Sequence, residues 1–300
     1  MRDVSFKVST LRIARARAEL TASSSTLATI REGKVPKGDP LSIAKAAAVT
    51  AAKKTTEWIP YCHNIPIEFV GVDFELLDDR ISVDVCVKSV AKTGVEMEAM
   101  TAAAAAALTL YDMLKMIDDD MEIVSVRLLE KKGGKSNFVF DGAWSAGVLT
   151  VSDRAATGAY EDRSGEILVS GLGGFGATKI LKEVVPDEID DIRKIVRGWI
   201  EQKLDVILVT GGTGIGPRDR TPEAIEPLLE VRLPGVVQTL CQYGQDRMRT
   251  AMFSRSVAGV SGSSIIVAIP GSPGACEDAL HAIFPGLLHA KGMLAGGGHT

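Results

Sequence analysis

Several segments in the first half of the chain carry side chains suited to acid–base and phosphate chemistry. In chain order they are Lys37-Gly38-Asp39, a proline-marked run with Tyr61, Cys62 and His63, a run with Glu96, Met97 and Glu98, the pair Asp112 and Lys115, and the lysines from Lys131 to Lys135. Asp112 and Lys115 are three residues apart, so they share one face of a predicted helix. An acid, a base and several cations together suit a phosphorylated substrate.

Each of these segments also has a purely structural interpretation. Asp112 and Lys115 could form a surface ion pair, and such pairs stabilise a helix little. His63 beside Cys62 could be a satisfied pair in the core. Glu96 and Glu98 could lie on an exposed strand face, and the lysines of 131–135 could belong to a solvated turn. The spacing alone therefore leaves the reaction open.

A glycine-rich turn is the main chemical feature of the second half. Residues 211–216, Gly-Gly-Thr-Gly-Ile-Gly, directly follow a predicted buried strand and lead to a helix that starts near Thr221 and Pro222. Glycines after a strand let backbone N–H groups approach phosphate oxygens, and Thr-Pro suits a helix N-cap and first position. The turn matches neither the P-loop nor the dinucleotide fingerprint. A strand-to-helix turn without a ligand is the alternative.

Polar residues also follow the other predicted strands of this half. Ser152 and Asp153 end one strand, Asp187 follows another after Pro186, and Ser272 follows the last. Ligands bind at the carboxyl ends of parallel strands, so we expect these loops to meet at one edge of a sheet. Two aspartates near a phosphate loop suit a Mg²⁺ ion held largely by water and substrate phosphates. Asp187 could otherwise be only a helix N-cap.

The elements that must position these residues differ between the two halves. In the first half, residues 40–54 have helical spacing, 69–76 and 81–90 alternate as strands around a turn at 78–80, and a helix over 101–117 precedes a strand over 123–129. This order predicts an α+β domain, an antiparallel sheet with helices on one face, of the ferredoxin-like kind.

In the second half, strands and helices alternate. Strands are expected at 146–151, 178–185, 204–210 and 264–269, and helices at 163–171, 187–203, 221–231 and 273–289. Continuous apolar strands alternating with helices predict a three-layer α/β domain with a mainly parallel sheet. A turn cluster at 132–137 puts the boundary near residue 140, which gives domains of residues 1–140 and 145–300.

Composition narrows the class of protein. The chain has 300 residues, enough for two domains of ordinary size, and its net charge of −4 disfavours nucleic acid as a partner. Its four cysteines form no C-x-x-C pair, which argues against a zinc knuckle or a disulfide framework. The longest apolar stretch, Met100 to Leu110, is too short to span a bilayer, and no apolar signal core follows Met1. We therefore expect a cytoplasmic protein without a membrane partner.

Longer runs in residues 1–138 are specific enough to indicate a family. They are Asp3-Val4-Ser5, Lys37-Gly38-Asp39, Ala51-Ala52-Lys53-Lys54-Thr55, Ile59-Pro60-Tyr61-Cys62-His63, Lys92-Thr93-Gly94-Val95-Glu96-Met97-Glu98-Ala99, Leu110-Tyr111-Asp112-Met113, Val126-Arg127-Leu128-Leu129 and Gly133-Gly134-Lys135-Ser136. In this order they resemble cyclic pyranopterin monophosphate synthase. The resemblance implies rearrangement of cyclic dihydro-GTP into cyclic pyranopterin monophosphate with release of pyrophosphate, and no tightly bound cofactor.

The same resemblance implies roles for individual residues. Asp112 matches the catalytic aspartate and Lys115 the catalytic lysine, so we expect Lys115 to shuttle protons while Asp112 sets its charge state. The residues that match substrate-binding positions are Lys37, Tyr61, Cys62, His63, Glu96, Met97, Glu98 and Lys131. Two departures from the family pattern, Tyr61 for leucine and Asn64 for proline, remove no ionisable group.

A second set of motifs covers residues 145–299. These motifs are Thr210 to Gly214, Arg218-Asp219-x-Thr221-Pro222-Glu223-Ala224, Ser254-Arg255-Ser256-x-Ala258-Gly259 and Pro270-Gly271-Ser272-Pro273. They look like molybdopterin adenylyltransferase, which implies transfer of AMP from ATP, with Mg²⁺, to the terminal phosphate of molybdopterin. The resemblance implies that Asp187 and Asp219 are catalytic and bind Mg²⁺. The residues expected to contact substrate are Ser152, Asp153, Gly212, Thr213, Gly214, Ser254 and Ser272.

Together the resemblances imply a bifunctional enzyme of molybdenum cofactor biosynthesis whose two steps are separated by sulfur insertion. One alternative makes the C-terminal half a non-catalytic molybdopterin-binding or oligomerisation module, and another makes the first half a scaffold. The two families are hexameric and trimeric, so we expect a homo-oligomer with threefold symmetry, a hexamer or a trimer. The expected ligands are cyclic dihydro-GTP, molybdopterin and ATP.

Overall fold

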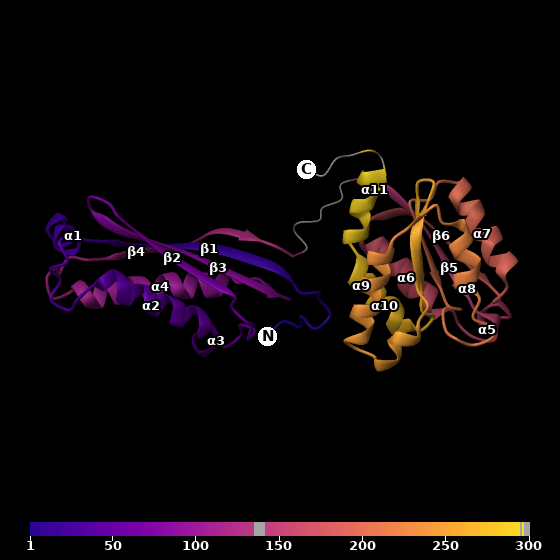
Figure 1. Ribbon diagram of the computed structural model, residues 1–300, viewed down its shortest axis with the longest axis horizontal. Coiled ribbons are helices and arrows are strands. Elements are labelled where there is room, and N and C mark those ends of the chain that lie inside the picture. The colour runs from indigo at the N-terminus through magenta and orange to yellow at the C-terminus, as the bar shows by residue number, and fades with distance from the viewer. Residues whose placement is uncertain (135–141, 295, 297–300) are drawn as a thin grey trace. The chain divides into compact units, whose positions relative to one another are not determined.

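The chain forms two compact units, Met1–Asn137 and Phe138–Thr300. The computed structural model describes residues 1–134, 142–294 and 296, and Figure 1 shows the elements of each unit. The predicted boundary near residue 140 lies outside the described residues. In the part of the chain that is described, no helix combines the length and the apolar character needed to cross a bilayer.

The N-terminal unit is an antiparallel sheet covered on one face by helices (Figure 1). Its strand order is β2-β3-β1-β4, with all neighbours antiparallel. The strands are β1 (Thr10–Thr21), β2 (Phe69–Leu76), β3 (Arg80–Ala91) and β4 (Ile123–Lys132), and the helices are α1 (Ser24–Arg31), α2 (Pro40–Lys53), α3 (Thr55–Trp58) and α4 (Glu96–Leu114). The α+β, ferredoxin-like prediction is confirmed.

The central strand β1 is absent from the sequence-based prediction. Its buried face consists of Ala14, Ala16, Ala18 and Leu20, all fully inaccessible to solvent. Alanine has little preference for strands, so this alternation is weak evidence for one. The small side chains are needed because α4, which is itself rich in buried alanines, packs directly against β1 and β3.

Helix α4 begins and ends earlier than predicted. It spans Glu96–Leu114, whereas the sequence suggested 101–117. Alanine is the strongest helix former, and the alanines from Ala99 onward favour a helix that begins earlier, at Glu96. Glu96 and Glu98 therefore lie in the first helical turn, and the interpretation that they lie on a strand face is wrong.

The C-terminal unit has three layers. Its six-stranded sheet has the order β6-β5-β7-β10-β9-β8, in which β5, β6, β7 and β10 are parallel and β8 and β9 are antiparallel to their neighbours. The strands are β5 (Trp144–Val151), β6 (Ala177–Val185), β7 (Val206–Thr210), β8 (Val231–Arg232), β9 (Val257–Ser261) and β10 (Ser264–Ile269). The predicted mainly parallel α/β architecture is confirmed.

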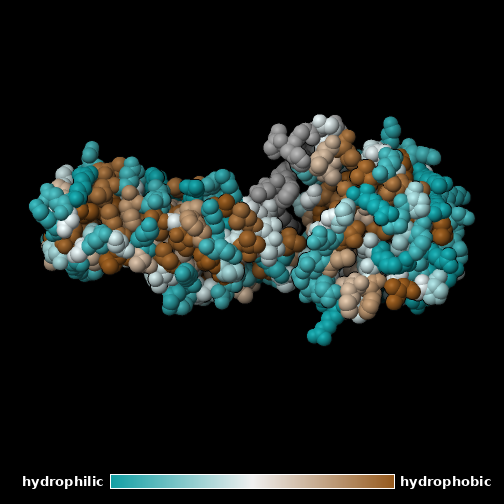
Figure 2. All heavy atoms as spheres, viewed as in Figure 1, coloured by the Kyte–Doolittle hydropathy of each residue, from teal (hydrophilic) through white to brown (hydrophobic). Residues whose placement is uncertain are grey.

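Helices cover both faces of this sheet and enclose two apolar cores. On one face lie α6 (Arg163–Gly174), α9 (Pro234–Gln245) and α10 (Pro273–Ile283), and on the other α7 (Ile189–Glu201) and α8 (Thr221–Ile225). Figure 2 shows mainly hydrophilic residues over the visible surface of this unit, as expected when most large apolar side chains fill the cores.

Several element limits differ from the prediction. Helix α8 has five residues and passes into a 3-10 turn at Glu226–Leu228, and α10 ends at Ile283 before the Phe284–Pro285 bond. The elements that the sequence did not predict here are α5 (Asp153–Ala156), β8, α9, β9 and α11 (His289–Leu294). Most of these elements are short, and in α9 only Tyr243 is fully buried, so their hydrophobic signals are weak.

Candidate functional site

Three charged residues meet at the C-terminal end of α4. The Nζ atom of Lys115 lies 2.8 Å from one carboxylate oxygen of Asp112, and the Nζ atom of Lys37 lies 3.0 Å from the other. Lys37 also donates to the backbone carbonyl of Asp112 at 2.7 Å. Hydrogen bonds from the two lysines lower the pKa of Asp112, and the carboxylate raises the pKa of Lys115. The arrangement holds Lys115 in its protonated form.

A second group lies at the other end of α4, around its first turn. Lys131 on β4 reaches Glu96 with a 3.7 Å Nζ–Oε1 distance. Glu98 is 4% exposed, and burial raises the pKa of its carboxyl. Burial, together with the charge of Glu98, raises the pKa of Cys62 as well. This group therefore combines a cation with a carboxyl that burial biases toward its neutral form.

The other residues predicted for the first half are His63, Tyr61, Met97 and the lysines of the basic loop. His63 is half-buried, and its Nε2 lies 2.7 Å from the backbone carbonyl of Arg2, so it is not paired with Cys62 in a core. Tyr61 is 78% exposed, and Met97 lies on α4 at 37% exposure. The lysines of the predicted basic loop divide: Lys131 and Lys132 belong to β4, and Lys135 lies outside the described residues.

The two groups do not form one site within a single chain. Glu96 and Asp112 are both on α4, sixteen residues apart. At 1.5 Å per residue this separates their backbones by about 24 Å. The predicted catalytic pair therefore lies at one end of the helix and most of the predicted substrate-binding residues lie at the other.

In the C-terminal unit, all nine predicted residues line one cavity. It has a volume of about 780 Å³ and lies at the carboxyl ends of β5, β6, β7 and β10. The nine are Ser152, Asp153, Asp187, Gly212, Thr213, Gly214, Asp219, Ser254 and Ser272. The expected meeting of these loops at one edge of the sheet is therefore observed.

The glycine turn after β7 needs glycine at two positions for steric reasons. Gly211 and Gly212 have φ angles of 102° and 60°. A Cβ atom on Gly211 would lie 2.1 Å from the backbone oxygen of Val151, and one on Gly212 would lie 2.5 Å from Oγ1 of Thr221. These glycines let the turn run close to β5 and to the start of α8.

The predicted N-cap of α8 is wrong. Helix α8 starts at Thr221 itself, and its Oγ1 donates to the backbone carbonyl of Gly211 at 2.7 Å. The threonine thus fastens the glycine turn to α8. The N-cap alternative for Asp187 is also wrong, because Glu188 precedes α7 and no side chain caps that helix.

Asp187 instead pairs with the loop after β5. Its Oδ2 accepts the backbone N–H of Asp153 at 3.1 Å, and Oδ1 of Asp153 accepts the backbone N–H of Asp187 at 3.1 Å. Burial raises the pKa of Asp187, and repulsion from Asp153 and Asp219 adds to the effect. Negative charge at this position is therefore costly unless a cation is near.

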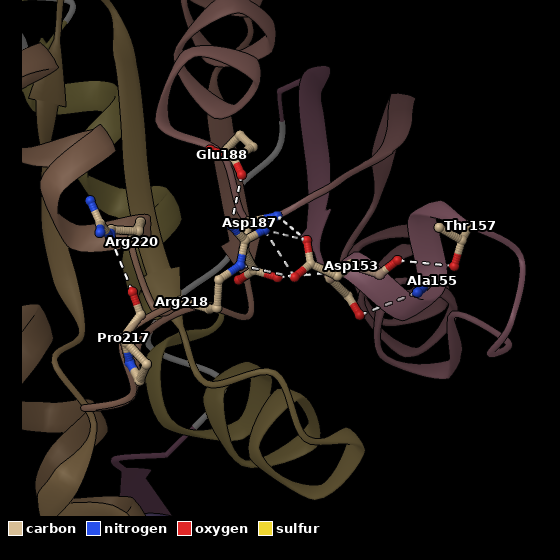
Figure 3. A network of polar contacts seen from close by, with 9 residues as sticks. Asp153, Ala155, Thr157, Asp187, Glu188, Pro217, Arg218 and Arg220 are labelled. Carbon is tan, nitrogen blue, oxygen red and sulfur yellow. Dashed lines mark hydrogen bonds and ion pairs between the residues drawn. The ribbon is translucent and has the colours of Figure 1, made fainter.

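Arg218 joins three of the loops (Figure 3). Its Nε and Nη2 donate to both carboxylate oxygens of Asp153 at 2.8–3.1 Å, and its Nη1 donates to Glu188 at 2.7 Å. The guanidinium lowers the pKa of Asp153. In the described ranges, no three His, Cys, Asp or Glu side chains are grouped to hold a metal ion, so a cation here would rely on two carboxylates.

Asp219 is fixed by the glycine turn and by Arg255. Its Oδ2 accepts the backbone N–H of Gly216 at 2.7 Å. Arg255 donates to the backbone carbonyls of Gly214 and Asp219, both at 2.7 Å, and pairs with Glu223. The turn and the aspartate therefore keep their positions through side-chain to backbone contacts.

Several cavity residues escaped the sequence analysis. Asp162 caps α6, and its carboxylate accepts from Thr150 and pairs with Lys182 at 3.0 Å. On another wall, Arg247 is paired with Asp278 at 3.4 Å. Asp162 had a detectable signal, because an aspartate before Arg-Ser-Gly at a helix start is a good N-cap. No sequence signal marked Arg247, which follows the unpredicted helix α9 by two residues.

Comparison with known proteins separates the chain along the same lines. Residues 1–134 match the MoaC family, and residues 147–289 match the family described as "Probable molybdopterin binding domain". A cyclic pyranopterin monophosphate synthase of Desulfitobacterium hafniense is 47% identical over 137 residues, which are 45% of this chain and 84% of the relative. The molybdopterin biosynthesis Mog protein from Mycobacterium ulcerans is 34% identical, with a TM-score of 0.49, over 51% of this chain and 99% of that chain.

Two of the relatives span both units. The molybdenum cofactor biosynthesis bifunctional protein of Chlorobaculum tepidum is 42% identical over 300 residues, which are 100% of this chain and 96% of the relative. The similarity therefore extends over the fused order of the two units as well as over each unit. The chain belongs to the family of bifunctional molybdenum cofactor biosynthesis proteins.

Proposed function

We propose that the chain catalyses two reactions of this pathway. Residues 1–140 convert cyclic dihydro-GTP to cyclic pyranopterin monophosphate and pyrophosphate, and residues 145–300 adenylylate molybdopterin with Mg²⁺-ATP. The observation that carries the proposal is the placement of ionisable residues: Lys37, Asp112 and Lys115 form one charged cluster, and Asp187 and Asp219 line one cavity with the glycine turn.

In the first reaction, Lys115 is the proton donor. Its ion pair with Asp112 raises its pKa, so the ammonium persists at neutral pH and can give a proton to the opening ring system. Asp112 holds the ammonium in place and takes part as its counter-ion. Lys37 adds a second positive charge that can hold the substrate's phosphates.

We assign the substrate-binding residues of this reaction to a second copy of the chain. Glu96 and Glu98 lie about 21–24 Å from Asp112 along α4, which is too far for one substrate to contact both groups in one chain. Between them α4 exposes apolar side chains, with Leu108 at 53% and Tyr111 at 36% exposure. Two copies packed with their α4 helices antiparallel would cover this face and bring opposite ends together; a hexamer of threefold symmetry can contain such twofold pairs, whereas a trimer cannot.

Mixing inactive variants tests the shared site. Asp112→Asn and Glu98→Gln change residues from the two ends of α4. In a random mixture of twofold pairs, about a quarter of the sites are free of both substitutions, so a refolded or co-expressed mixture should regain about that fraction of activity. A mixture as inactive as its components would contradict the shared site, whereas inactivity of Asp112→Asn alone tests the reaction assignment.

In the second reaction, the cavity binds the nucleotide at the glycine turn. The turn presents backbone N–H groups close to a helix start, and Ser254 lies 3.3 Å from Thr213 with its hydroxyl toward that turn. Asp187 and Asp219 fit a Mg²⁺ ion, since two carboxylates beside substrate phosphates are its usual protein environment. Bound there, the ion neutralises phosphate charge. The residues of the cavity position the α-phosphate of ATP and the terminal phosphate of molybdopterin for transfer of AMP.

A second candidate function is a C-terminal unit that binds molybdopterin or holds the oligomer together without catalysis. Incubating the chain with Mg²⁺-ATP and molybdopterin distinguishes the two. We expect adenylylated molybdopterin and pyrophosphate from the unsubstituted chain and neither from Asp219→Ala. If no adduct forms and the two proteins behave alike, the binding module is the better description.

A further inference from the structure

Arg218 forms ion pairs with acidic residues from two neighbouring loops beside the cavity. Its guanidinium comes from the loop after β7 and reaches Asp153 after β5 and Glu188 after β6 (Figure 3). Every nitrogen of the guanidinium donates to a carboxylate at 2.7–3.1 Å. Such forked contacts fix direction as well as distance. Arg218, together with the backbone N–H of Asp187, therefore sets where the Asp153 carboxylate points.

Asp153 brings a third carboxylate to the lining of the cavity, but in the described ranges the three aspartates are not grouped as a metal site. It lies beside Asp187, with which it exchanges two backbone-to-carboxylate hydrogen bonds of 3.1 Å. Both of its carboxylate oxygens are nevertheless engaged by Arg218, and its negative charge is compensated. Within residues 1–134 and 142–294, Asp187 and Asp219 form no ion pair within 4.0 Å with a basic side chain. The three aspartates are thus divided into one paired and two available carboxylates.

We propose that Arg218 is a positioning residue that keeps Asp153 out of the cation site, so that a divalent cation binds at Asp187 and Asp219 firmly only together with nucleotide phosphates. The inference rests on the proposed use of Mg²⁺-ATP by this cavity. Two carboxylates supply too few oxygens for tight binding of the bare ion, and phosphates complete its shell. A third free carboxylate would let the cation bind without nucleotide and resist its release.

The test measures binding of Mn²⁺ alone to the full chain, without nucleotide or molybdopterin, by the electron paramagnetic resonance signal of the free ion. The unsubstituted chain should bind Mn²⁺ weakly at this site, which Asp187→Asn defines by its loss. Arg218→Gln should bind Mn²⁺ about tenfold more tightly, because it adds a ligand charge. The double variant Arg218→Gln with Asp153→Asn should return to the unsubstituted value.

Two single variants serve as controls. Glu188→Gln removes the other partner of Arg218 and leaves its contact with Asp153, so Mn²⁺ affinity should not change. Asp153→Asn in the otherwise unsubstituted chain should also leave Mn²⁺ affinity unchanged, because Arg218 already occupies that carboxylate. A loss of Mn²⁺ affinity in this variant would overturn the inference even if Arg218→Gln folds poorly.

Two results would overturn the inference. Mn²⁺ binding by folded Arg218→Gln that is no tighter than in the unsubstituted chain shows that Arg218 does not withhold Asp153. Weakening of Mn²⁺ binding by Asp153→Asn to the level of Asp187→Asn shows that Asp153 is itself a ligand. Because no substrate is present, either result is independent of whether the cavity adenylylates molybdopterin.

Discussion

The substitution Gly214→Ala tests the role of Asp219 without changing an ionisable group. Gly214 has an ordinary backbone conformation, so alanine introduces no strain in φ. Its Cβ would lie 2.7 Å from Oδ2 of Asp219, whereas an ordinary contact begins at 3.4 Å. The carboxylate must therefore move by about 0.7 Å and weaken the 2.7 Å hydrogen bond from Gly216.

The magnitude follows from how sharply transfer reactions depend on position. Misplacement of a catalytic contact by about 1 Å can reduce the rate about 100-fold. For a displacement of about 0.7 Å we expect a 10- to 100-fold fall in kcat/KM, which corresponds to about 1.4–2.7 kcal/mol of transition-state stabilisation. Thermal stability should change little, because the displaced group is the end of a flexible side chain and is partly exposed.

The assay is molybdopterin-dependent release of pyrophosphate from Mg²⁺-ATP. The control is Gly198→Ala in α7, where a Cβ meets no atom within 4 Å, and it should retain activity and gain slightly in stability. A Cβ on residue 214 could also obstruct a phosphate directly, so Gly214→Ala is combined with Asp219→Asn. If the alanine acts through the aspartate, the double variant is no worse than Asp219→Asn.

Two results would refute this reasoning. Gly214→Ala with activity within about threefold of the unsubstituted chain would show that the position of the Asp219 carboxylate is not critical. Additive losses in the double variant would show that the added methyl group acts on the substrate and not on Asp219.

Other predictions concern both units. Asp112→Asn should lower the pKa of Lys115 toward its ordinary value and reduce cyclic dihydro-GTP conversion more than about 100-fold, with an unchanged Tm because both groups are exposed. Burial raises the pKa of Asp187 in the folded state above its value in the unfolded chain. Ionised Asp187 therefore destabilises the fold at a pH above the folded-state pKa, and this cost disappears at a pH below the pKa of the unfolded chain. Asp187→Asn should therefore raise the Tm near pH 7, with a gain that shrinks as the pH falls; a gain that grows on acidification would contradict the shift. Gly147→Ala places a Cβ 2.5 Å from the Trp199 ring and should cost about 1–3 kcal/mol by chemical denaturation, and an unchanged midpoint would show that the ring can move freely.

Most of the architecture was predictable because its hydrophobic patterns are strong. The alternation in β3 and the apolar runs of β5, β7 and β10 each bury the residues that the pattern selects. The failures have the opposite cause. In β1 the alternation is regular, but alanines and not β-branched residues fill the buried face, and in α9 only Tyr243 is fully buried, so both hydrophobic signals are weak.

The sequence by itself determined the residue types of the C-terminal site and their convergence. Polar residues at the ends of parallel strands meet at one edge because successive strands point the same way, and the four loops do line one cavity. The sequence could not determine which aspartate of the site forms an ion pair with an arginine. Arg218 lies thirty or more residues from each of its partners, and only the sheet order brings Asp153 and Glu188 within its reach.

For the N-terminal unit the sequence determined the helix spacing of Asp112 and Lys115, which the structure places 2.8 Å apart. The sequence did not show that most of the predicted substrate-binding residues lie at the opposite end of α4. That separation depends on where α4 begins, and the helix extends back to Glu96 because its alanines pack on the small buried face of β1. Local spacing fixes contacts within a helical turn, whereas the distance between sites is decided by the length of the helix that tertiary packing stabilises.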